Sequence, residues 1–410
     1  MDTLNPPKDH PKKFLNLALG DPTAHGLCPP QVLVDAMHGV LDGTHSNGYL
    51  PATGDPKARV AIGHYSSREG FPVDEDDVVI ASGCSGAVEL VISAMVDEGD
   101  NILVPSPGFP LYQVITESLG GSVKNYPLLP LSNWECDLKA MEKLIDRRTK
   151  AILINNPSNP CGANYSAAHL TEIAKVARKH NLPIICDEIY SGIVFDGPFT
   201  PMNTVCGDVP IISVGGLAKE FVCPGWRVGW LVIHDRGHRL SEVKTGIKQL
   251  TQLIVGANSL VQHCIPKVLT PEKGSPDEKY LAEYAKKYIG LLHTNSMATV
   301  ELSKDCAGLD VIPAQGAMYA MVKIQLEKLS GVTTDTDFAQ QLLQEENLIV
   351  LPGSCFGITG FIRILTCPTQ EVINDAMQRM QDFCDRRSIK DDKAASGSAE
   401  SSPTKKRRHT

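Results

Sequence analysis

The chain lacks any run of apolar residues that could cross a lipid bilayer. Its longest apolar stretch, residues 253–265, is interrupted by Asn258, Gln262 and His263, whereas a membrane-spanning helix needs about 20 apolar residues. The first 13 residues contain prolines and acids but no apolar core of the kind that export signals carry. We therefore expect no membrane association and a cytoplasmic location, with the mitochondrion or the nucleus as alternatives.

An excess of basic charge is also missing. The 39 lysines and arginines against 47 aspartates and glutamates leave a formal net charge of −8, the wrong sign for a protein that covers nucleic acid phosphates. The 12 cysteines are scattered singly between Cys28 and Cys384 without a CxxC pair, which suits neither a disulfide framework nor a zinc site. The motifs GxGxxG and GxxxxGK[ST] are absent too, so nothing indicates a nicotinamide-dependent dehydrogenase or a P-loop protein. Nucleic acid and metal ions are not expected as partners.

The chain does contain enough apolar material for a large folded protein. At roughly 150 residues per domain, a chain of 410 residues forms two or three domains, and 42% hydrophobic residues supply their cores. From residue 77 onward, short β-rich runs alternate with amphipathic stretches that are typical of helices. The strand runs are 76–82, 101–106, 150–156, 183–188, 209–215 and 227–233. This alternation predicts an α/β fold with a mostly parallel central sheet and helices on both faces.

The same pattern suggests where the domains begin and end. We expect a large domain over residues 46–270 and a smaller α+β domain over residues 271–387, with the N-terminal segment 1–45 packed against the small domain. Residues 388–410 lack aromatic side chains and have little apolar surface, so they are expected to form a disordered basic tail. The KKRRH string in this tail is typical of a nuclear-import signal or, as we favour, of a solvated terminus.

The segment 213–230, SVGGLAKEFVCPGWRVGW, carries the strongest chemical signal. Lys219 follows a predicted strand and two glycines, a setting in which partial burial favours a free amine that can attack a carbonyl. Ser213 and Arg227 add a hydroxyl and a guanidinium, groups that hold phosphate. A lysine after glycines is more often an ordinary surface residue, so the interpretation depends on what the other strand ends carry.

Polar groups follow three other predicted strands. Asp187 ends the strand PIICDE, with Tyr190 three residues later, and Asn159 lies in the loop NNPSNPCG. The string ASGCSGAVEL ends a strand and opens a helix, so an anion site is expected at Cys84, Ser85 and Gly86. Each feature alone also fits a solvated strand end or a plain turn. Because ligands of open α/β sheets bind at the carboxyl ends of the strands, we expect them to converge.

An amine, a carboxylate, polar hydrogen-bonding groups and a phosphate cradle are the set that pyridoxal phosphate needs. In this order and spacing the chain resembles fold-type I pyridoxal-phosphate enzymes, specifically class I aminotransferases of the tyrosine aminotransferase group. The likeness extends from about Asn16 to near Cys384. It is carried by the strings LGDPTAHG, NGYLPATG, ASGCSGAVEL, NILVPSPGFPLY, NNPSNPCG, DEIYSGIVF, GGLAKEFVCPGWRVGW, LPGSCFG and FIRIL.

The resemblance implies a role for each residue near the reacting atoms. Lys219 would hold pyridoxal phosphate covalently and, once released, move a proton as general base and acid. Asp187 would pair with the pyridine nitrogen, while Asn159 and Tyr190 would bond the phenolic oxygen. Phe109 of SPGFPLY would stack on the ring face, although a core aromatic is the simpler alternative. The implied catalytic residues are thus Lys219, Asp187 and Tyr190.

The resemblance also implies how the phosphate is held. The groups expected around it are Cys84, Ser85 and Gly86 at the helix start, together with Ser213 and Arg227. Tyr49 of NGYLPATG would reach the same phosphate from a second subunit. The working unit implied is therefore a homodimer with two-fold symmetry.

For the substrate, the resemblance implies a clamp on the α-carboxylate. Arg363 of FIRIL would bind it in a bidentate manner, since a guanidinium presents a fork of donors. Gly20 would approach it through its backbone, and Asn159 would assist. The alternative for Arg363 is a surface arginine, because Ile362 and Ile364 flank it and leave its own face undecided.

The function expected first is transfer of the amino group of an aromatic amino acid, tyrosine foremost, to a 2-oxo acid. A broad-specificity or alanine aminotransferase, or a carbon–sulfur β-lyase, is the alternative on the same scaffold, because the same residues serve all of these reactions. A binding protein that has lost activity and acts through its basic tail is a further alternative. The intact lysine, aspartate and arginine set argues against it.

Overall fold

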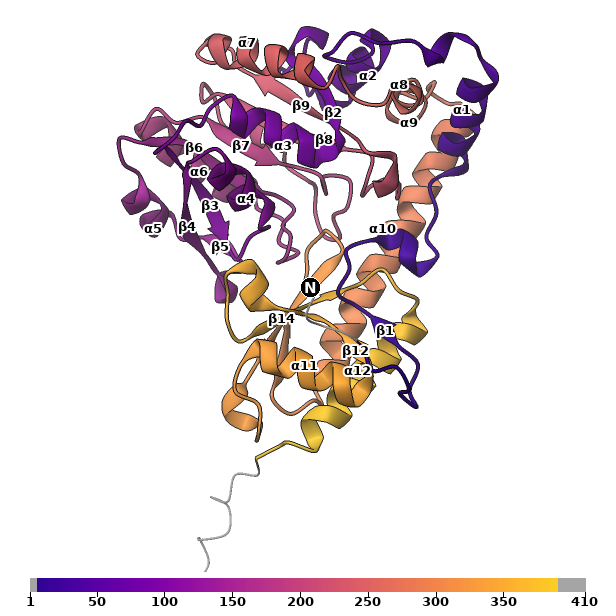
Figure 1. Ribbon diagram of the computed structural model, residues 1–410, viewed down its shortest axis with the longest axis vertical. Coiled ribbons are helices and arrows are strands. Elements are labelled where there is room, and N and C mark those ends of the chain that lie inside the picture. The colour runs from indigo at the N-terminus through magenta and orange to yellow at the C-terminus, as the bar shows by residue number, and fades with distance from the viewer. Residues whose placement is uncertain (1–5, 390–410) are drawn as a thin grey trace, which may run out of the picture.

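The computed structural model describes residues 6–389, arranged as a large α/β unit and a smaller α+β unit below it (Figure 1). The long helix α10 (Pro276–Ser303) runs from the large unit down to the small one. The part of the chain that carries the N-terminal residues follows it along the same side. Over the described residues, no helix is both long and apolar enough to cross a membrane.

The large unit is built on an eight-stranded sheet in the order β2-β9-β8-β7-β6-β3-β4-β5. Its strands are β2 (Val78–Ser82), β3 (Asn101–Ser106), β4 (Ser122–Leu129), β5 (Glu135–Cys136), β6 (Thr149–Asn155), β7 (Ile184–Asp187), β8 (Ile211–Gly216) and β9 (Val228–His234). Neighbours from β8 to β4 run parallel. The strand β9 is antiparallel to both β2 and β8, and β5 is antiparallel to β4. The predicted α/β class with a mostly parallel sheet is confirmed.

The middle positions of the central strands form continuous apolar runs because both faces of the sheet are covered. Within β6, Ile152 packs into the core on one face, and Leu153 packs into the core on the other. Ile184 and Ile185 of β7 divide in the same way. Successive side chains of a strand point to opposite faces. These continuous apolar runs therefore pack against a helical layer on each face of the sheet. That rigid sheet fixes the positions of the strand ends.

The small unit has a four-stranded antiparallel sheet in the order β10-β11-β14-β13. Its strands are β10 (Leu309–Ile312), β11 (Tyr319–Ile324), β13 (Leu351–Pro352) and β14 (Phe361–Leu365). A separate two-stranded pair joins β1 (Leu15–Asn16) to β12 (Leu348–Ile349) in parallel. Leu15 and Leu17 are buried in the core of the small unit, whereas Leu33 is buried among residues of the large unit.

Helices cover the sheets and connect the strands. Beside α10 they are α1 (Gln31–Asp42), α2 (Pro56–Ser66), α3 (Gly83–Ser93), α4 (Leu111–Ser118), α5 (Leu138–Leu144), α6 (Ala167–Lys179), α7 (Ser241–Leu250), α8 (Ser259–Gln262), α9 (Ile265–Leu269), α11 (Asp335–Glu346) and α12 (Gln370–Asp385). Several begin at residues whose side chains accept from the first turn. Ser166 accepts from the amide of His169 at α6, and Ser275 accepts from that of Glu278 at α10. Such caps satisfy backbone donors that the helix leaves free and define where it starts.

The predicted basic tail lies mostly outside the described residues. Its first two residues, Ser388 and Ile389, are described: Ser388 pairs with Leu329, and the amide of Ile389 donates to the carbonyl of Lys328 at 2.9 Å. The division into domains at residues 45, 270 and 387 stays a prediction.

Candidate active site

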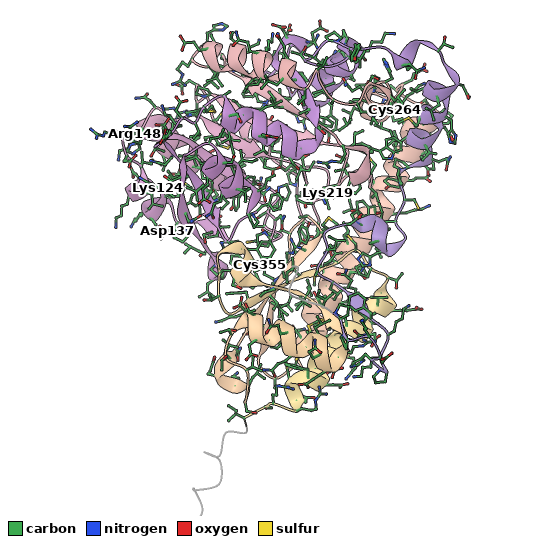
Figure 2. All side chains as sticks on the ribbon, viewed as in Figure 1. Lys124, Asp137, Arg148, Lys219, Cys264 and Cys355 are labelled. Carbon is green, nitrogen blue, oxygen red and sulfur yellow. The ribbon has the colours of Figure 1, made fainter. Side chains whose placement is uncertain are left out.

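A cavity of about 480 Å³ lies between the large and the small unit, at the carboxyl ends of β6 and β7. In Figure 2, the labelled Lys219 lies on the side of the large unit and Cys355 faces it from the small one. Ten of the residues predicted from the sequence line this cavity: Gly20, Cys84, Ser85, Phe109, Asn159, Asp187, Tyr190, Lys219, Arg227 and Arg363. Segments far apart in the chain therefore meet where the sequence analysis expects a ligand.

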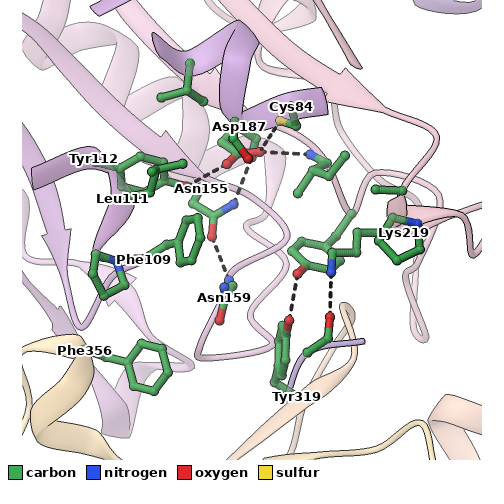
Figure 3. A pocket seen from close by; sticks show the side chains of 18 of the residues that line it. Cys84, Phe109, Leu111, Tyr112, Asn155, Asn159, Asp187, Lys219, Tyr319 and Phe356 are labelled. Carbon is green, nitrogen blue, oxygen red and sulfur yellow. Dashed lines mark hydrogen bonds between the residues drawn. The ribbon is translucent and has the colours of Figure 1, made fainter. Parts of the chain in front are cut away.

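Lys219 projects into the cavity from the loop after β8. Its Nζ donates to the backbone carbonyl of Gly20 at 2.7 Å (Figure 3). The amine is thus held by a single neutral acceptor from the N-terminal segment, with no carboxylate paired to it among the described residues. A lysine in this position can exchange that contact for another partner.

Asp187 ends β7 and is only 5% exposed. Its Oδ1 accepts from the amide of Ile189 at 3.1 Å and faces the thiol of Cys84 at 3.7 Å, and its Oδ2 accepts from the hydroxyl of Tyr112 at 2.7 Å (Figure 3). Burial raises the pKa of the Asp187 carboxyl, while these three donors lower it. In the described part of the chain no cation pairs with it. A buried carboxylate that has donors but no cation suits a positively charged ligand atom.

The amino end of α3 lies beside Arg227, and the two together could hold an anion. Gly83 begins the helix with φ of +74°, and a Cβ on it would lie 2.5 Å from Nη2 of Arg227. Arg227 is held there by the carbonyls of Pro224 at 3.1 Å and Ser82 at 3.5 Å. Gly229 allows β9 to lie close to the start of α3, since a Cβ on it would lie 2.3 Å from the amide nitrogen of Cys84. Free helix N–H groups beside a guanidinium are what a phosphate requires.

Arg363 of β14 is 4% exposed and points into the cavity from the small unit. Its Nη1 donates to Oδ1 of Asn159 at 2.8 Å and its Nη2 to the carbonyl of Ala18 at 2.7 Å. The guanidinium lies between the rings of Tyr319 and Phe356, at 4.1 and 4.7 Å from their centroids. Its Nε has no acceptor among the described residues. Held by neutral acceptors alone, this buried cation is ready to bind an anion.

Tyr190 and Asn159 complete the lining on the side of the large unit. The hydroxyl of Tyr190 lies 3.0 Å from that of Tyr319, and burial raises the pKa of Tyr190 well above its usual value. Asn159 is positioned by its amide, which donates to Oδ1 of Asn155 at 2.7 Å. Asn155 in turn donates to the carbonyl of Asp187 at 3.1 Å. The cavity wall from Asp187 to Arg363 is therefore one hydrogen-bonded chain.

Phe109 precedes α4 and leaves 37% of its surface exposed at the cavity. Its ring meets that of Tyr112 edge-on, with centroids 5.8 Å apart. It is therefore not the core aromatic that the sequence left as an alternative. Its side chain is therefore accessible to a ligand in the cavity.

The structure does not bring Ser213 to this site, so the expected phosphate contact is corrected. Its hydroxyl lies 3.0 Å from Nε2 of His234 and lines a separate polar cavity. The reason is the alternation of β8, because Ser213 points to the face opposite Ile212 and Val214.

Two further predicted residues do not line the cavity. Gly86 lies in the first turn of α3, where a Cβ on it would contact the side chains of Ser82 and Ala81 at 3.6 and 3.7 Å. It therefore serves the packing of the helix on its strand. Tyr49 is 93% exposed and does not line the cavity of its own chain. Its expected contact with a second subunit stays a prediction.

Sequence reasoning missed Tyr112, Tyr319 and Phe356, which contact Asp187 or Arg363. Tyr112 could have been found, because it stands in the same string as Phe109, three residues later. Tyr319 and Phe356 could not have been found from the sequence, since only the packing of the small unit brings them beside Arg363. The backbone carbonyl of Ala18 carries no sequence signal, and Gly20 was expected beside the substrate carboxylate rather than as the acceptor of Lys219.

Comparison with known proteins agrees with this geometry. Residues 12–380 match the family described as aminotransferase class I and II. Tyrosine aminotransferase of Dictyostelium discoideum is 39% identical over 378 residues, which cover 91% of this chain and 89% of that protein. The crystal structure of tyrosine aminotransferase from Leishmania infantum has a TM-score of 0.89 at 36% identity, covering 94% of this chain and 95% of that one. Alanine aminotransferase from Pyrococcus furiosus has a TM-score of 0.86 at 31% identity, and the match covers 92% of this chain and 93% of that one.

The lysine, the buried carboxylate and the helix start beside Arg227 suit the amine, ring and phosphate chemistry of pyridoxal phosphate. The chain belongs to the aminotransferase class I and II family, whose members use pyridoxal phosphate. It is therefore a pyridoxal-phosphate-dependent aminotransferase that acts on amino acids and 2-oxo acids.

Proposed function

We propose that the enzyme transfers the amino group of an aromatic amino acid, tyrosine foremost, to a 2-oxo acid. The observation that carries this proposal is the lining of the cavity near Arg363. Its apolar wall comes from both units: Leu19, Pro110, Leu111, Leu351, Cys355 and Phe356. Among the described residues, the cations that line the cavity are Lys219, Arg227 and Arg363. Since the cofactor and the α-carboxylate would engage all three, an apolar or aromatic side chain suits the remaining wall better than a second carboxylate.

The residues near the reacting atoms would divide the chemistry among them. When bound, pyridoxal phosphate supplies an electron sink that makes the α-proton of an amino acid acidic. The Lys219 amine would hold the cofactor at rest and, once free, accept that proton and return it to a different atom. Asp187 would keep a proton on the ring nitrogen, because an ionised carboxylate in a buried place favours a cation beside it.

The remaining residues would bind and orient. Arg363 would hold the α-carboxylate through its fork of donors, with Asn159 already fixing one arm of the guanidinium at 2.8 Å. Tyr190 would donate to the phenolic oxygen. Phe109 would cover one face of the ring and exclude water from it. Ser85, the first amides of α3 and Arg227 would hold the phosphate.

We further propose a homodimer, in which Tyr49 of each chain completes the site of the other. Two features support it. Tyr49 is almost fully exposed, which is unusual for an aromatic residue with no partner. Its loop lies beside a second exposed apolar segment, because the hydroxyl of Ser259 donates to the carbonyl of Ser46 at 3.2 Å.

A broad-specificity or alanine aminotransferase is the second candidate for the substrate. The similarity to the alanine aminotransferase of P. furiosus favours it. The same apolar wall that accepts a phenol ring would also accept a methyl group, although it would gain less buried surface from it.

The test is an absorbance titration of the purified protein with cofactor, followed by steady-state assays. We expect a visible absorbance band from the bound cofactor that changes when tyrosine is added and is absent from Lys219→Ala. We also expect the ratio kcat/KM for tyrosine to exceed that for alanine by at least about tenfold, because an aromatic ring buries far more apolar surface. A larger kcat/KM for alanine would overturn the tyrosine proposal. Release of pyruvate and ammonia from a cysteine conjugate without any 2-oxo acid would instead indicate the β-lyase.

A further inference from the structure

Tyr112 touches two of the residues that would contact the cofactor ring. Its hydroxyl donates to Oδ2 of Asp187 at 2.7 Å, and its ring packs edge-on against Phe109 (Figure 3). Its side chain is buried, with 1% of its surface exposed. It is also fixed by the helix that it helps to begin, because Thr116 donates to its backbone carbonyl at 2.7 Å.

We propose that Tyr112 is a positioning residue for the cofactor: its hydroxyl holds the Asp187 carboxylate ionised and in place, and its ring supports Phe109. The inference rests on the proposed pairing of Asp187 with the ring nitrogen and goes beyond it. In this proposal Tyr112 orients the Asp187 carboxylate, although Tyr112 itself does not touch the reacting atoms.

The hydrogen bonds around Asp187 show why the hydroxyl of Tyr112 matters. Oδ1 has two donors, the amide of Ile189 at 3.1 Å and the thiol of Cys84 at 3.7 Å. Within the described residues, Oδ2 has only the hydroxyl of Tyr112. Without it the carboxylate keeps one backbone bond and one weak thiol contact, neither of which fixes its rotation. The carboxylate plane therefore depends on Tyr112.

The pKa shifts of Asp187 and Tyr112 also support a hydrogen bond in which Tyr112 is the donor. Burial raises the pKa of Asp187 and so opposes its charged form, and the hydrogen bond from Tyr112 is the largest contribution that lowers it. Burial and the neighbouring carboxylate raise the pKa of Tyr112 well above its usual value. The tyrosine therefore keeps its proton near neutral pH and acts as the donor in its hydrogen bond to Asp187.

The test compares two buried tyrosines that each donate one hydrogen bond. Tyr112→Phe removes the hydroxyl and keeps the ring against Phe109. Tyr126→Phe is the matched control, because the hydroxyl of Tyr126 donates to the carbonyl of Leu153 at 2.8 Å in the core, away from the cavity. For Tyr112→Phe we expect the dissociation constant of pyridoxal phosphate from the apoprotein to rise about 10- to 100-fold, the range for a hydrogen bond to a charged group. We expect kcat to fall by a similar factor. KM for the amino donor should change less than about twofold, because Arg363 is untouched.

Two further variants separate the possible failures. If Asp187→Asn binds the cofactor and turns over like the wild type, the proposed role of Asp187 is wrong and the inference falls with it. If Asp187→Asn is impaired but Tyr112→Phe behaves like Tyr126→Phe, the inference about the hydroxyl is wrong by itself. Tyr112→Leu, which also removes the ring, should bind the cofactor more weakly than Tyr112→Phe. Equal affinities of these two would overturn the role of the ring.

Discussion

At the scale of single residues, the chain has a partly buried histidine on the far side of the sheet from the proposed chemistry. His234 ends β9, and its two ring nitrogens lie 3.0 Å from the hydroxyl of Ser213 and 3.2 Å from Nδ2 of Asn203. Burial, together with the nearby Arg236, lowers the pKa of His234 from 6.5 to about 4. The ring is therefore neutral in the folded protein at pH 7. It accepts from Ser213 or donates to it according to its tautomer.

This lowered pKa makes stability depend on pH in a definite direction. The unfolded chain binds a proton at His234 near pH 6.5, whereas the folded chain binds it only near pH 4. The free energy of unfolding therefore contains a contribution from neutral His234 that is complete above pH 6.5. This contribution is lost as the pH falls toward 4, by up to about 3 kcal/mol. We predict that His234→Gln, which keeps a polar partner for Ser213, weakens this loss. The measurement is the free energy of unfolding in urea at pH 7.5, 6 and 5, at one protein concentration.

The control for His234→Gln is His38→Gln, which removes a histidine from an exposed position of α1. Relative to the wild type, the His234 variant should gain stability as the pH falls from 6.5, and the His38 variant should not. Parallel pH profiles for the wild type and His234→Gln would contradict the prediction.

At the scale of elements, the start of α3 joins the sheet to the anion site. Gly83 has a positive φ, and the space where its Cβ would lie is occupied by the guanidinium of Arg227. We predict that Gly83→Ala displaces this guanidinium and raises the dissociation constant of pyridoxal phosphate at least about tenfold, or about 1.4 kcal/mol. The measurement is titration of the apoprotein with the cofactor, followed by absorbance.

Gly99→Ala is the matched control for Gly83→Ala. Gly99 has φ of +80°, close to that of Gly83, but no atom lies within 4 Å of where its Cβ would be. Both variants carry a similar backbone strain of about 1 kcal/mol, so only the contact with Arg227 differs. A loss of affinity as large in Gly99→Ala as in Gly83→Ala would show that strain alone is responsible.

The elements also show how far the sequence could predict this structure. The strands ending at Ser82, Asn155 and Asp187 could be predicted, because each is a short, continuous apolar run between amphipathic stretches. The strand β4 was not predicted, because polar residues make up most of the first half of its run SVKNYPLL and a proline interrupts the second. The antiparallel direction of β9 was not predicted either, since the hydrophobic pattern of a buried strand does not depend on its direction.

The same limit applies to the candidate site. Lys219, Asp187 and Asn159 could be found because they follow different predicted strands of one sheet, and Arg363 could be found through the resemblance that its string FIRIL carries. Ser213 was misplaced, because the alternation of β8 turns it to the opposite face. The carbonyls that hold Lys219 and Arg363 depend on how the N-terminal segment crosses the cavity, which no local pattern encodes.

At the scale of the whole molecule, the exposed apolar residues near Tyr49 need an explanation. Leu253, Ile254 and Val255 are exposed by 79%, 63% and 53%, respectively, directly before the loop that contacts residues 46 and 52. Val255 also has φ of +58°, a strained value for a β-branched residue. A strained apolar loop beside an exposed tyrosine is typical of a surface that a second chain covers. If Tyr49 of that chain binds the phosphate, then assembly and cofactor binding must be linked.

We therefore predict that Ile254→Asp weakens both assembly and cofactor binding, because a charge in an apolar interface loses its hydration. Leu131→Asp is the matched control: Leu131 is fully exposed at 101% and lies in the turn after β4, away from Tyr49 and its loop. Sedimentation velocity should give a dimer for the wild type and for Leu131→Asp, and a monomer for Ile254→Asp at micromolar concentration. The monomer should bind pyridoxal phosphate at least about tenfold more weakly, since each site then lacks one phosphate ligand. A monomeric wild type that binds the cofactor tightly would refute the dimer, and a monomeric Ile254→Asp with unchanged affinity would refute the role of Tyr49 while leaving the dimer intact.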